Sequence, residues 1–193
     1  PVSGEIWVNE LRVIGADDSP GWAYSTSANF TFADLLTVNM NLSETNPYFH
    51  KLTDRFGTRV HSRNWGVSAD LDVMKLVPFE MTGSNLRVSY SRTESVGKPL
   101  YLPGTDVLVE EASKILEQTM IDSGSTETSA QRASEQLKSD VQTISTSDTW
   151  NASNIRLRLP WDHWLIRDTF NSLTFGFNYN RTFSRNPTVL SNS

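Results

Sequence analysis

The chain has 193 residues and no cysteine, which excludes disulfides and cysteine-ligated metals. Its formal net charge of -5 at pH 7 gives no basic footprint for nucleic acid, and its 37% of hydrophobic residues is a low share for a compact globule. No stretch of 18 apolar residues predicts a transmembrane helix, and a chain that begins at Pro1 is expected to be a mature fragment or a segment of something larger.

The first part of the chain predicts three β-strands. Residues 6–13 are apolar on both parities at their start, which suits a strand that is covered on both faces. In residues 22–42, even positions are mostly aromatic or aliphatic and odd positions carry hydroxyl or amide groups, and this period of two indicates β-structure. The alternation breaks only at 33–35, so we expect strands 22–32 and 36–43 to form a hairpin.

Four further strands follow from the same alternation of apolar and polar side chains. They are predicted at residues 64–73, 85–92, 154–161 and 172–180. From the second strand on, the connections are expected to run short, long, short, long, short, an order typical of outer-membrane barrels with short periplasmic turns and longer external loops. The short connections are 33–35, 74–84 and 162–171, and the long ones are 44–63 and 93–153.

The longest connection, 93–153, contains two helical patterns. Apolar side chains recur at helical spacing in 106–120, with Glu110 and Glu111 in the first turn, and more sparsely in 126–144. The predicted fold class is therefore all-β: an antiparallel amphipathic β-meander, a segment of a large transmembrane β-barrel, with a helical extracellular loop insertion. Residues 1–193 form a single barrel-wall segment in this interpretation.

The alternation assigns the strand side chains to two faces, one toward lipid and the other toward a water-filled lumen. A half-buried soluble sheet is the alternative. The predicted lipid-facing residues are Trp22, Tyr24, Phe30, Phe32, Leu36, Val38, Met40, Leu42, Trp65, Val67, Leu71, Val73, Leu86, Val88, Tyr90, Leu173, Phe175, Phe177 and Tyr179. The predicted lumen-facing residues are Asn29, Thr31, Thr37, Asn39, Asn41, Ser68, Asp70, Asp72, Arg87, Arg156, Arg158, Thr174 and Asn178.

The sequence contains no arrangement that indicates an enzyme. His50, His61 and His163 lie far apart and lack metal-binding spacing, and no phosphate-binding loop, nucleophile elbow or dinucleotide-binding motif occurs. Asp70 and Asp72 are interpreted as the wet face of a strand rather than as a cation site. We therefore expect no catalytic residue, no cofactor and no bound metal.

Two further sets of side chains have competing interpretations. Arg87, Arg156 and Arg158 form either a positively charged lumen wall or, in the simpler interpretation, cross-strand partners of Asp70 and Asp72. Aromatic residues near the strand ends are interpreted as an interfacial girdle, with the core of a β-sandwich as the alternative. These are Trp7, Trp22, Tyr24, Trp65, Tyr90, Trp150, Trp161 and Trp164.

Two other functions remain open on the residues alone. A different outer-membrane barrel, such as a nutrient or lipopolysaccharide transporter, uses strands of the same kind. A soluble β-sandwich binding module, whose aromatic side chains stack on sugars, is favoured by strands 85–92 and 154–161. These show only three or four apolar positions each, which is short for a bilayer span.

Four stretches carry a family resemblance: IWVNELRV at 6–13, GWA at 21–23, ADLLTVNMNLSETNP at 33–47 and PLYLPGTDVLVE at 99–110. In order and approximate spacing they resemble the outer-membrane translocon family of the type IX secretion system, the gliding-motility and secretion family called SprA or Sov. The agreement covers about residues 5–110. The chain departs at 45–57, where TNPYFHKLTDRFG replaces a G-F-G-S-like stretch, so it resembles a divergent fragment.

The resemblance implies a very large single-chain barrel in the bacterial outer membrane that exports folded cargo. It also implies the partners: outer-membrane lipid, the remaining strands of the parent barrel, secreted protein cargo, a shuttle barrel at a lateral exit, and a periplasmic plug. Seven strands cannot close such a pore, so we expect a wall segment whose edges pair with other strands. The expected mechanism is passive, because a polar wall lets protein slide through without sticking.

Overall fold

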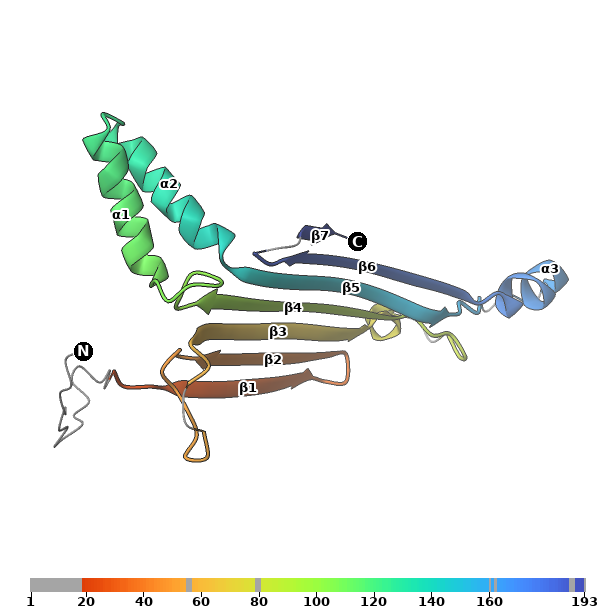
Figure 1. The fold of residues 1–193 in the computed structure, drawn as a ribbon. Coiled ribbons are helices and arrows are strands. Elements are labelled where there is room, and N and C mark those ends of the chain that lie inside the picture. Colours follow the sequence, from red (N-terminus) through yellow and green to blue (C-terminus); the bar gives the residue numbers. More distant parts are fainter. Residues whose placement is uncertain are drawn as a thin grey trace, which may run out of the picture.

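The computed structural model describes residues 19–54, 57–78, 81–159, 161, 163–187 and 190–192. They form one antiparallel sheet in which each strand pairs with the next in sequence, from β1 to β7 (Figure 1). The strands are β1 Ala23–Phe32, β2 Leu36–Thr45, β3 Val60–Asp72, β4 Arg87–Pro99, β5 Thr143–Ile155, β6 Phe175–Arg185 and β7 Leu190–Asn192. The helices are η1 Val73–Leu76, α1 Val109–Asp122, α2 Glu127–Asp140, α3 Trp164–Asp168 and η2 Phe170–Ser172.

The sheet is a single layer, and no second sheet or helix covers either of its faces within the described residues (Figure 1). The buried hydrophobic side chains of this part of the chain are only Val109, Ala130, Val141 and Ala152. The accessible surface of 14693 Å² exceeds the roughly 9,200 Å² expected of a compact globule of this mass. The two packed sheets of a β-sandwich are therefore not what these residues form.

The meander and most of its strands follow the alternation of the sequence. The hairpin of β1 and β2 is confirmed, and the strands predicted at 64–73, 85–92 and 172–180 correspond to β3, β4 and β6. The predicted strand 6–13, with Trp7, lies outside the described residues. The sheet is open in the structure, with β1 at one edge and the short β7 at the other.

The strand predicted at 154–161 is wrong, because β5 covers Thr143–Ile155 instead. The five residues after Ile144, STSDT, are all polar. The alternation of the two faces, which the pairing with β4 shows, is therefore not visible as an alternation of apolar and polar residues. The register shifts between Ala152 and Ile155, and Asn154 adopts a positive φ of 53° there, as expected of a β-bulge. Beyond the bulge, Arg156 forms only an isolated bridge with Asn85.

The strands also extend further into the range 93–153 than the sequence indicated. β4 continues to Pro99 and β5 begins at Thr143, so the connection between them is 100–142. The two helical patterns within it are confirmed as α1 and α2. The side chains of Thr105 and Asp106 do not cap α1, whose N-cap residue is Leu108.

The expected alternation of short and long connections is wrong. The connections 33–35, 73–86 and 156–174 lie at one end of the sheet, which we call the turn end. The connections 46–59 and 100–142 lie at the other, which we call the helix end. Connection 73–86 is as long as 46–59, and 156–174 is longer because it contains α3 and η2. Loop length therefore does not distinguish the two ends.

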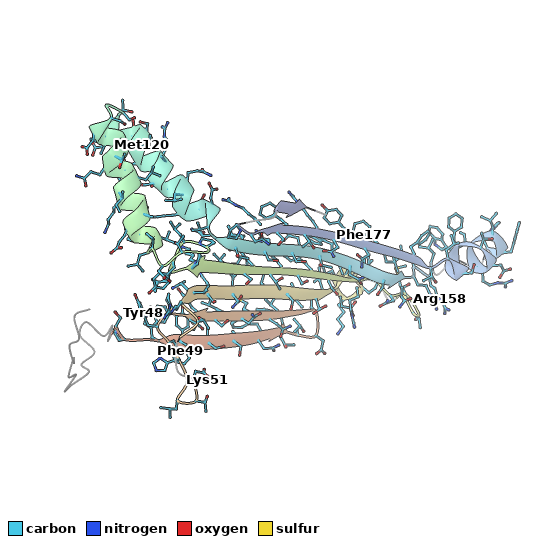
Figure 2. The ribbon with its side chains drawn as sticks, viewed as in Figure 1. Tyr48, Phe49, Lys51, Met120, Arg158 and Phe177 are labelled. Carbon is cyan, nitrogen blue, oxygen red and sulfur yellow. The ribbon has the colours of Figure 1, made fainter. Side chains whose placement is uncertain are left out.

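Helices α1 and α2 form a hairpin that projects from the helix end, with Met120 at its tip, whereas α3 extends from the turn end (Figures 1 and 2). The two helices pack through small buried side chains, including Ser113, Ala130 and Ser134. Lys138 of α2 forms an ion pair of 2.8 Å with Glu110 of α1. This hydrogen bond lowers the pKa of Glu110 below its ordinary value.

Candidate functional site

The pairing register gives the sheet two chemically distinct faces, because directly opposite residues of neighbouring strands point to the same side. One cross-strand row consists of Phe30, Val38, Ala69, Tyr90, Trp150 and Tyr179. The row one residue away consists of Asn29, Asn39, Ser68, Ser91, Thr149 and Asn180. We call the side with the first row the apolar face and the side with the second row the polar face.

The polar face is built almost entirely from small uncharged groups across the middle of the sheet. Hydrogen bonds link Asn29 to Asn39, Asn39 Nδ2 to Ser68 Oγ at 3.4 Å, and Ser95 Oγ to Asn64 Oδ1 at 2.6 Å. In register it carries Ser25, Ser27, Asn29, Thr31, Thr37, Asn39, Asn41, Ser43, Asn64, Gly66, Ser68, Ser89, Ser91, Thr93, Ser95, Ser145, Ser147, Thr149, Asn151, Asn178, Asn180, Thr182 and Ser184.

The apolar face carries a continuous band of aromatic and aliphatic side chains. In β2 and β3 the band occupies four alternate positions of each strand, and in β6 it runs from Tyr179 through Phe177 to Phe175. Its members in β1 to β3 are Ala28, Phe30, Phe32, Leu36, Val38, Met40, Leu42, Trp65, Val67, Ala69 and Leu71. Those in β4 to β6 are Val88, Tyr90, Trp150, Ala152, Ile155, Phe175, Phe177 and Tyr179.

Aromatic side chains line the helix-end margin of this band and turn their polar atoms toward acidic groups. The Tyr24 hydroxyl donates to Glu44 at 2.5 Å, and Trp65 Nε1 donates to Glu94 Oε1 at 3.1 Å. Further along, the Tyr90 hydroxyl lies 3.3 Å from Asp148 Oδ1, and its ring centroid lies 4.5 Å from that of Trp150. Each ring therefore covers apolar surface with its body and contacts polar groups with its tip.

Beyond this aromatic margin the apolar face becomes charged. Arg92 Nη1 lies 3.6 Å from Asp148 Oδ1, and the Arg92 guanidinium stacks over the Trp65 ring at 5.8 Å from its centroid. His61 Nε2 lies 2.8 Å from Glu44 Oε1. Counting from the turn end, the first charged residues of the face in β2 to β6 are Glu44, Arg63, Arg92, Asp148 and Arg181.

The boundary between the apolar band and these charges is inclined to the strands. Glu44 pairs directly with Arg63, but Arg92 of β4 pairs with Val67, four residues nearer the turn end than Arg63. The first charged residues of β5 and β6, Asp148 and Arg181, lie in the same cross-strand row as Arg92. A shift of four residues is about 13 Å along a strand, and β2 and β6 are about 19 Å apart. Averaged over β2 to β6, this single step between β3 and β4 corresponds to an inclination of about 35° from the perpendicular to the strands.

The residues predicted to face lipid or lumen fall into these two faces wherever they belong to strands β1 to β6. Seven lie beside the strands. Trp22 precedes β1, Val73 begins η1, Leu86 precedes β4 and Leu173 precedes β6, whereas the predicted lumen-facing Arg156, Arg158 and Thr174 lie in the connection between β5 and β6. Trp22 stacks on Tyr24 with ring centroids 5.7 Å apart. The orientation of the faces toward lipid and lumen stays a prediction.

Within the described part of the chain, only one of the three turn-end arginines forms an ion pair with one of the two aspartates. Arg87 Nη2 lies 3.7 Å from Asp72 Oδ2. Arg156 Nη2 instead donates to Thr174 Oγ1 at 3.5 Å, and the backbone N–H of Arg158 donates to Ser84 Oγ at 2.7 Å. Arg158 lies outside the strands, near the far turn end of the sheet (Figure 2). Among the described residues, no group of three or more His, Asp or Glu side chains is arranged to hold a metal ion.

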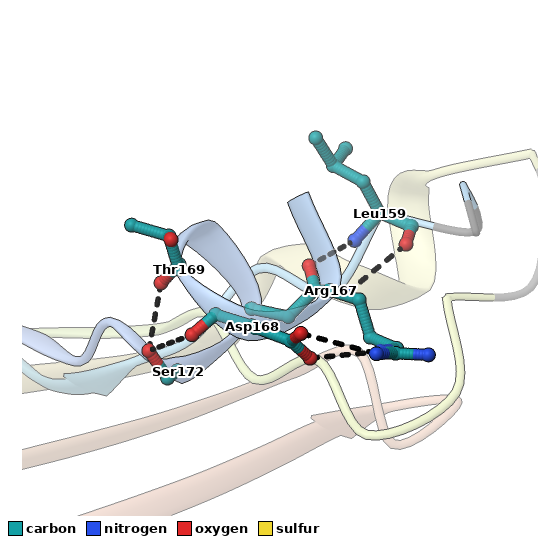
Figure 3. Close-up of polar contacts among 6 residues, drawn as sticks. Leu159, Arg167, Asp168, Thr169 and Ser172 are labelled. Carbon is teal, nitrogen blue, oxygen red and sulfur yellow. Dashed lines mark hydrogen bonds and ion pairs between the residues drawn. The ribbon is translucent and has the colours of Figure 1, made fainter. Parts of the chain in front are cut away.

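The aromatic segment between β5 and β6 is held by a small polar cluster. The Asn171 side chain forms two hydrogen bonds with the backbone of Leu159. It accepts one from the Leu159 N–H at 2.9 Å and donates one to the Leu159 carbonyl at 3.3 Å. Arg167 pairs with Asp168 at 2.7 Å and thereby lowers the pKa of this carboxyl (Figure 3). Trp161 and Trp164 stay exposed, consistent with neither being a core residue.

The sequence did not single out Arg92, Asp148 and Arg181. They occupy apolar-face positions, and Asp148 falls in the strand that the sequence missed. Only the register shows that they are neighbours, because they come from three strands. One pattern in the sequence could have predicted β5: every second residue from Thr143 to Asn151 is Ser, Thr or Asn.

None of the helices in the described ranges is long and apolar enough to cross a membrane. A search of curated proteins finds no relative that matches the chain. A family model, SprA_N, described as motility related/secretion protein, matches residues 1–112, which is more than half of the 193 residues. This match confirms the family resemblance of the sequence and relates the chain to motility and secretion. The chain therefore belongs to the motility-related and secretion protein family SprA.

Proposed function

We propose that this sheet is a wall segment of a protein-conducting β-barrel, the translocon of type IX secretion, in the bacterial outer membrane. The apolar face contacts lipid and the polar face lines the passage for exported protein. The observation that carries the proposal is the separation of a continuous apolar band from a face of Ser, Thr and Asn, in a sheet that no other described element covers. Family membership supplies the link to secretion.

The apolar face needs a partner, and lipid fits its extent. Phe30, Phe32, Phe175 and Phe177 are 48%, 54%, 60% and 57% exposed, and they lie in one band rather than singly. A soluble sheet buries such a face against a second layer, because large contiguous apolar patches in water promote association. In a bilayer the same band is covered by acyl chains along all six long strands.

The inclined boundary supports a membrane orientation independently. In transmembrane barrels the strands are tilted by about 35–45° to the membrane normal, so a membrane plane crosses successive strands at shifted residues. The slope of about 35° across β2 to β6 has this size.

The polar face suits the passage of protein without chemistry. Its central side chains are neutral, short and hydrogen-bonded to each other, so they offer neither an apolar surface nor a strong charge to hold an exported chain. We propose that the segment acts as a passive wall and not as an enzyme. The shuttle barrel and the periplasmic plug are proposed as partners only from the family resemblance.

The edges of the sheet require further strands. The outer edge of β1 and most of the outer edge of β6 carry backbone groups that no strand pairs within the described residues. Such edges are unstable in lipid, where every backbone N–H and C=O must be satisfied. We therefore propose that the parent barrel supplies a strand at each side.

Two neighbouring residues of β2 test the assignment of faces. Val38→Arg places a charge in the middle of the apolar band, at an expected cost of about 2–4 kcal/mol, and assembly in the outer membrane is lost. Asn39→Arg places the same charge on the polar face and is tolerated. The measurement is the amount of folded, heat-modifiable protein in the outer-membrane fraction. Equal tolerance or equal loss of the two variants contradicts the proposal.

A further inference from the structure

A cavity of about 240 Å³ lies on the apolar face, at the point where the apolar band meets the charged residues of β4 to β6. It is lined by Arg92, Thr146, Asp148, Arg181 and Phe183. Its charged core is one cross-strand row, Arg92–Asp148–Arg181. The adjacent row toward the turn end is Tyr90–Trp150–Tyr179, so the cavity opens directly above the aromatic margin.

The charges of this cavity do not balance. Two guanidinium groups face one carboxylate, and Asp148 already contacts both Arg92 at 3.6 Å and the Tyr90 hydroxyl at 3.3 Å. Arg181 is exposed and forms no ion pair with any described residue. The Nε of Arg92 is shielded from solvent and has no hydrogen-bond partner in the same part of the chain. The cavity therefore offers arginine donors to an anion.

The surroundings select an anion that carries a hydrocarbon tail. Phe183 lines the cavity, and Tyr179, Phe177 and Phe175 follow Arg181 on the same face of β6 toward the turn end. Planar guanidinium groups bind phosphate oxygens in pairs, and Arg92 of β4 and Arg181 of β6 present two of them on either side of Asp148 of β5. An amphiphile places its phosphate between the arginines and its tail on the apolar band.

We infer that Arg92 and Arg181 bind the phosphate headgroup of an anionic membrane lipid whose acyl chains lie along β5 and β6. The inference rests on the proposed function, because it requires the apolar band to lie in a bilayer. It adds that the row Arg92–Asp148–Arg181 lies at the level of the lipid headgroups. The strand positions of the apolar face nearest the turn end, including Phe32, Leu36 and Leu71, carry no charge.

The test uses the intact protein, purified in a neutral maltoside detergent. The probes are dioctanoyl phosphatidic acid, dioctanoyl phosphatidylcholine and inorganic phosphate, and the readout is the thermal unfolding midpoint. Phosphatidic acid is expected to raise the midpoint of the wild-type protein more than either other probe. Arg181→Gln is the main variant, because Arg181 loses no ion pair with any described residue. This variant needs about tenfold more phosphatidic acid for the same shift. Arg156→Gln, on the polar face, is the matched control and keeps the wild-type response.

Several results overturn the inference. One is a wild-type unfolding midpoint that phosphatidic acid does not raise. Another is an equal rise with inorganic phosphate, which indicates a site for free anions. The third is a response of Arg156→Gln to phosphatidic acid that is weakened as much as that of Arg181→Gln. Arg92→Lys keeps the charge but not the paired geometry, so its affinity lies between those of the wild type and Arg181→Gln. The proposed function fails separately, in the comparison of Val38→Arg with Asn39→Arg. Wild-type protein that assembles normally and does not respond to phosphatidic acid refutes only the lipid site.

Discussion

At the scale of single residues, the turn between β1 and β2 carries local strain. Ala33 and Asp34 have positive φ values of 43° and 56°, and the N–H of Leu35 donates to the carbonyl of Phe32 at 2.8 Å. This is the type I′ geometry whose twist matches a β-hairpin. Asp tolerates the left-handed region through its short polar side chain, whereas Ala has no such compensation.

Replacing the strained alanine is therefore expected to stabilise the hairpin. Ala33→Gly removes the Cβ from the left-handed position and raises stability by about 0.5–1 kcal/mol. The measurement is the urea midpoint of the protein in detergent micelles. Ala28→Gly, in the interior of β1, is the control and lowers stability by a similar amount. A lower midpoint for Ala33→Gly refutes the strain argument.

At the scale of elements, one ion pair ties the helices of the α1–α2 hairpin together. The Lys138 hydrogen bond lowers the pKa of Glu110, so the folded hairpin holds this carboxylate charged to a lower pH than the unfolded chain does. The contribution is complete above the unfolded pKa and is lost as the pH falls through the lowered folded pKa. It is small, below about 1 kcal/mol, because both groups are solvent-exposed to a large degree.

Neutralising this carboxylate gives a pH-dependent phenotype. Glu110→Gln is expected to speed amide hydrogen exchange in α1 and α2 at pH 7, and the difference from the wild type shrinks at acidic pH. Glu111→Gln changes the adjacent acid in the same first turn and serves as the control. A difference between Glu110→Gln and the wild type that persists below the lowered pKa contradicts the role of the charge.

Prediction from the sequence succeeded where one face of an element is uniformly apolar. In β1 and β2 the apolar parity has no charge before Glu44, so both strands and their turn were readable. In β5 the same face carries Thr146 and Asp148, and the strand was read as loop. Beyond the bulge at Asn154, apolar and polar residues alternate again. The predicted strand was therefore placed at 154–161, C-terminal to the true strand β5.

The candidate lipid site illustrates what no single strand can reveal. Arg92 and Arg181 lie far apart in sequence and become neighbours of Asp148 only through two strand pairings. The register depends on where β5 begins, and that depends on the length of the α1–α2 insertion. Side-chain alternation gives the faces of a sheet, but the rows across it require the pairing.

At the scale of the whole molecule, the two ends of the sheet are expected to lie on opposite sides of the membrane. Met120 at the tip of the helical hairpin and Arg158 near the turn end mark these ends (Figure 2). Since this chain has no cysteine, Met120→Cys and Arg158→Cys each introduce one thiol into it. A membrane-impermeant maleimide on intact cells is expected to label Met120→Cys and to reach Arg158→Cys only after the outer membrane is opened. The reverse pattern contradicts the extracellular position that we expect from the sequence for the helical insertion.

If the sheet is a barrel wall, as proposed, the inclination of the apolar boundary also bears on the size of the barrel. A strand tilted by about 35° takes up about 5.9 Å of a barrel's circumference, so the six long strands provide about 35 Å. A folded domain of about 100 residues is about 34 Å wide, and with the inward side chains it requires a circumference near roughly 140 Å. A pore of that calibre needs about 24 such strands, and under the proposed function the six long strands of this chain are about one quarter of them.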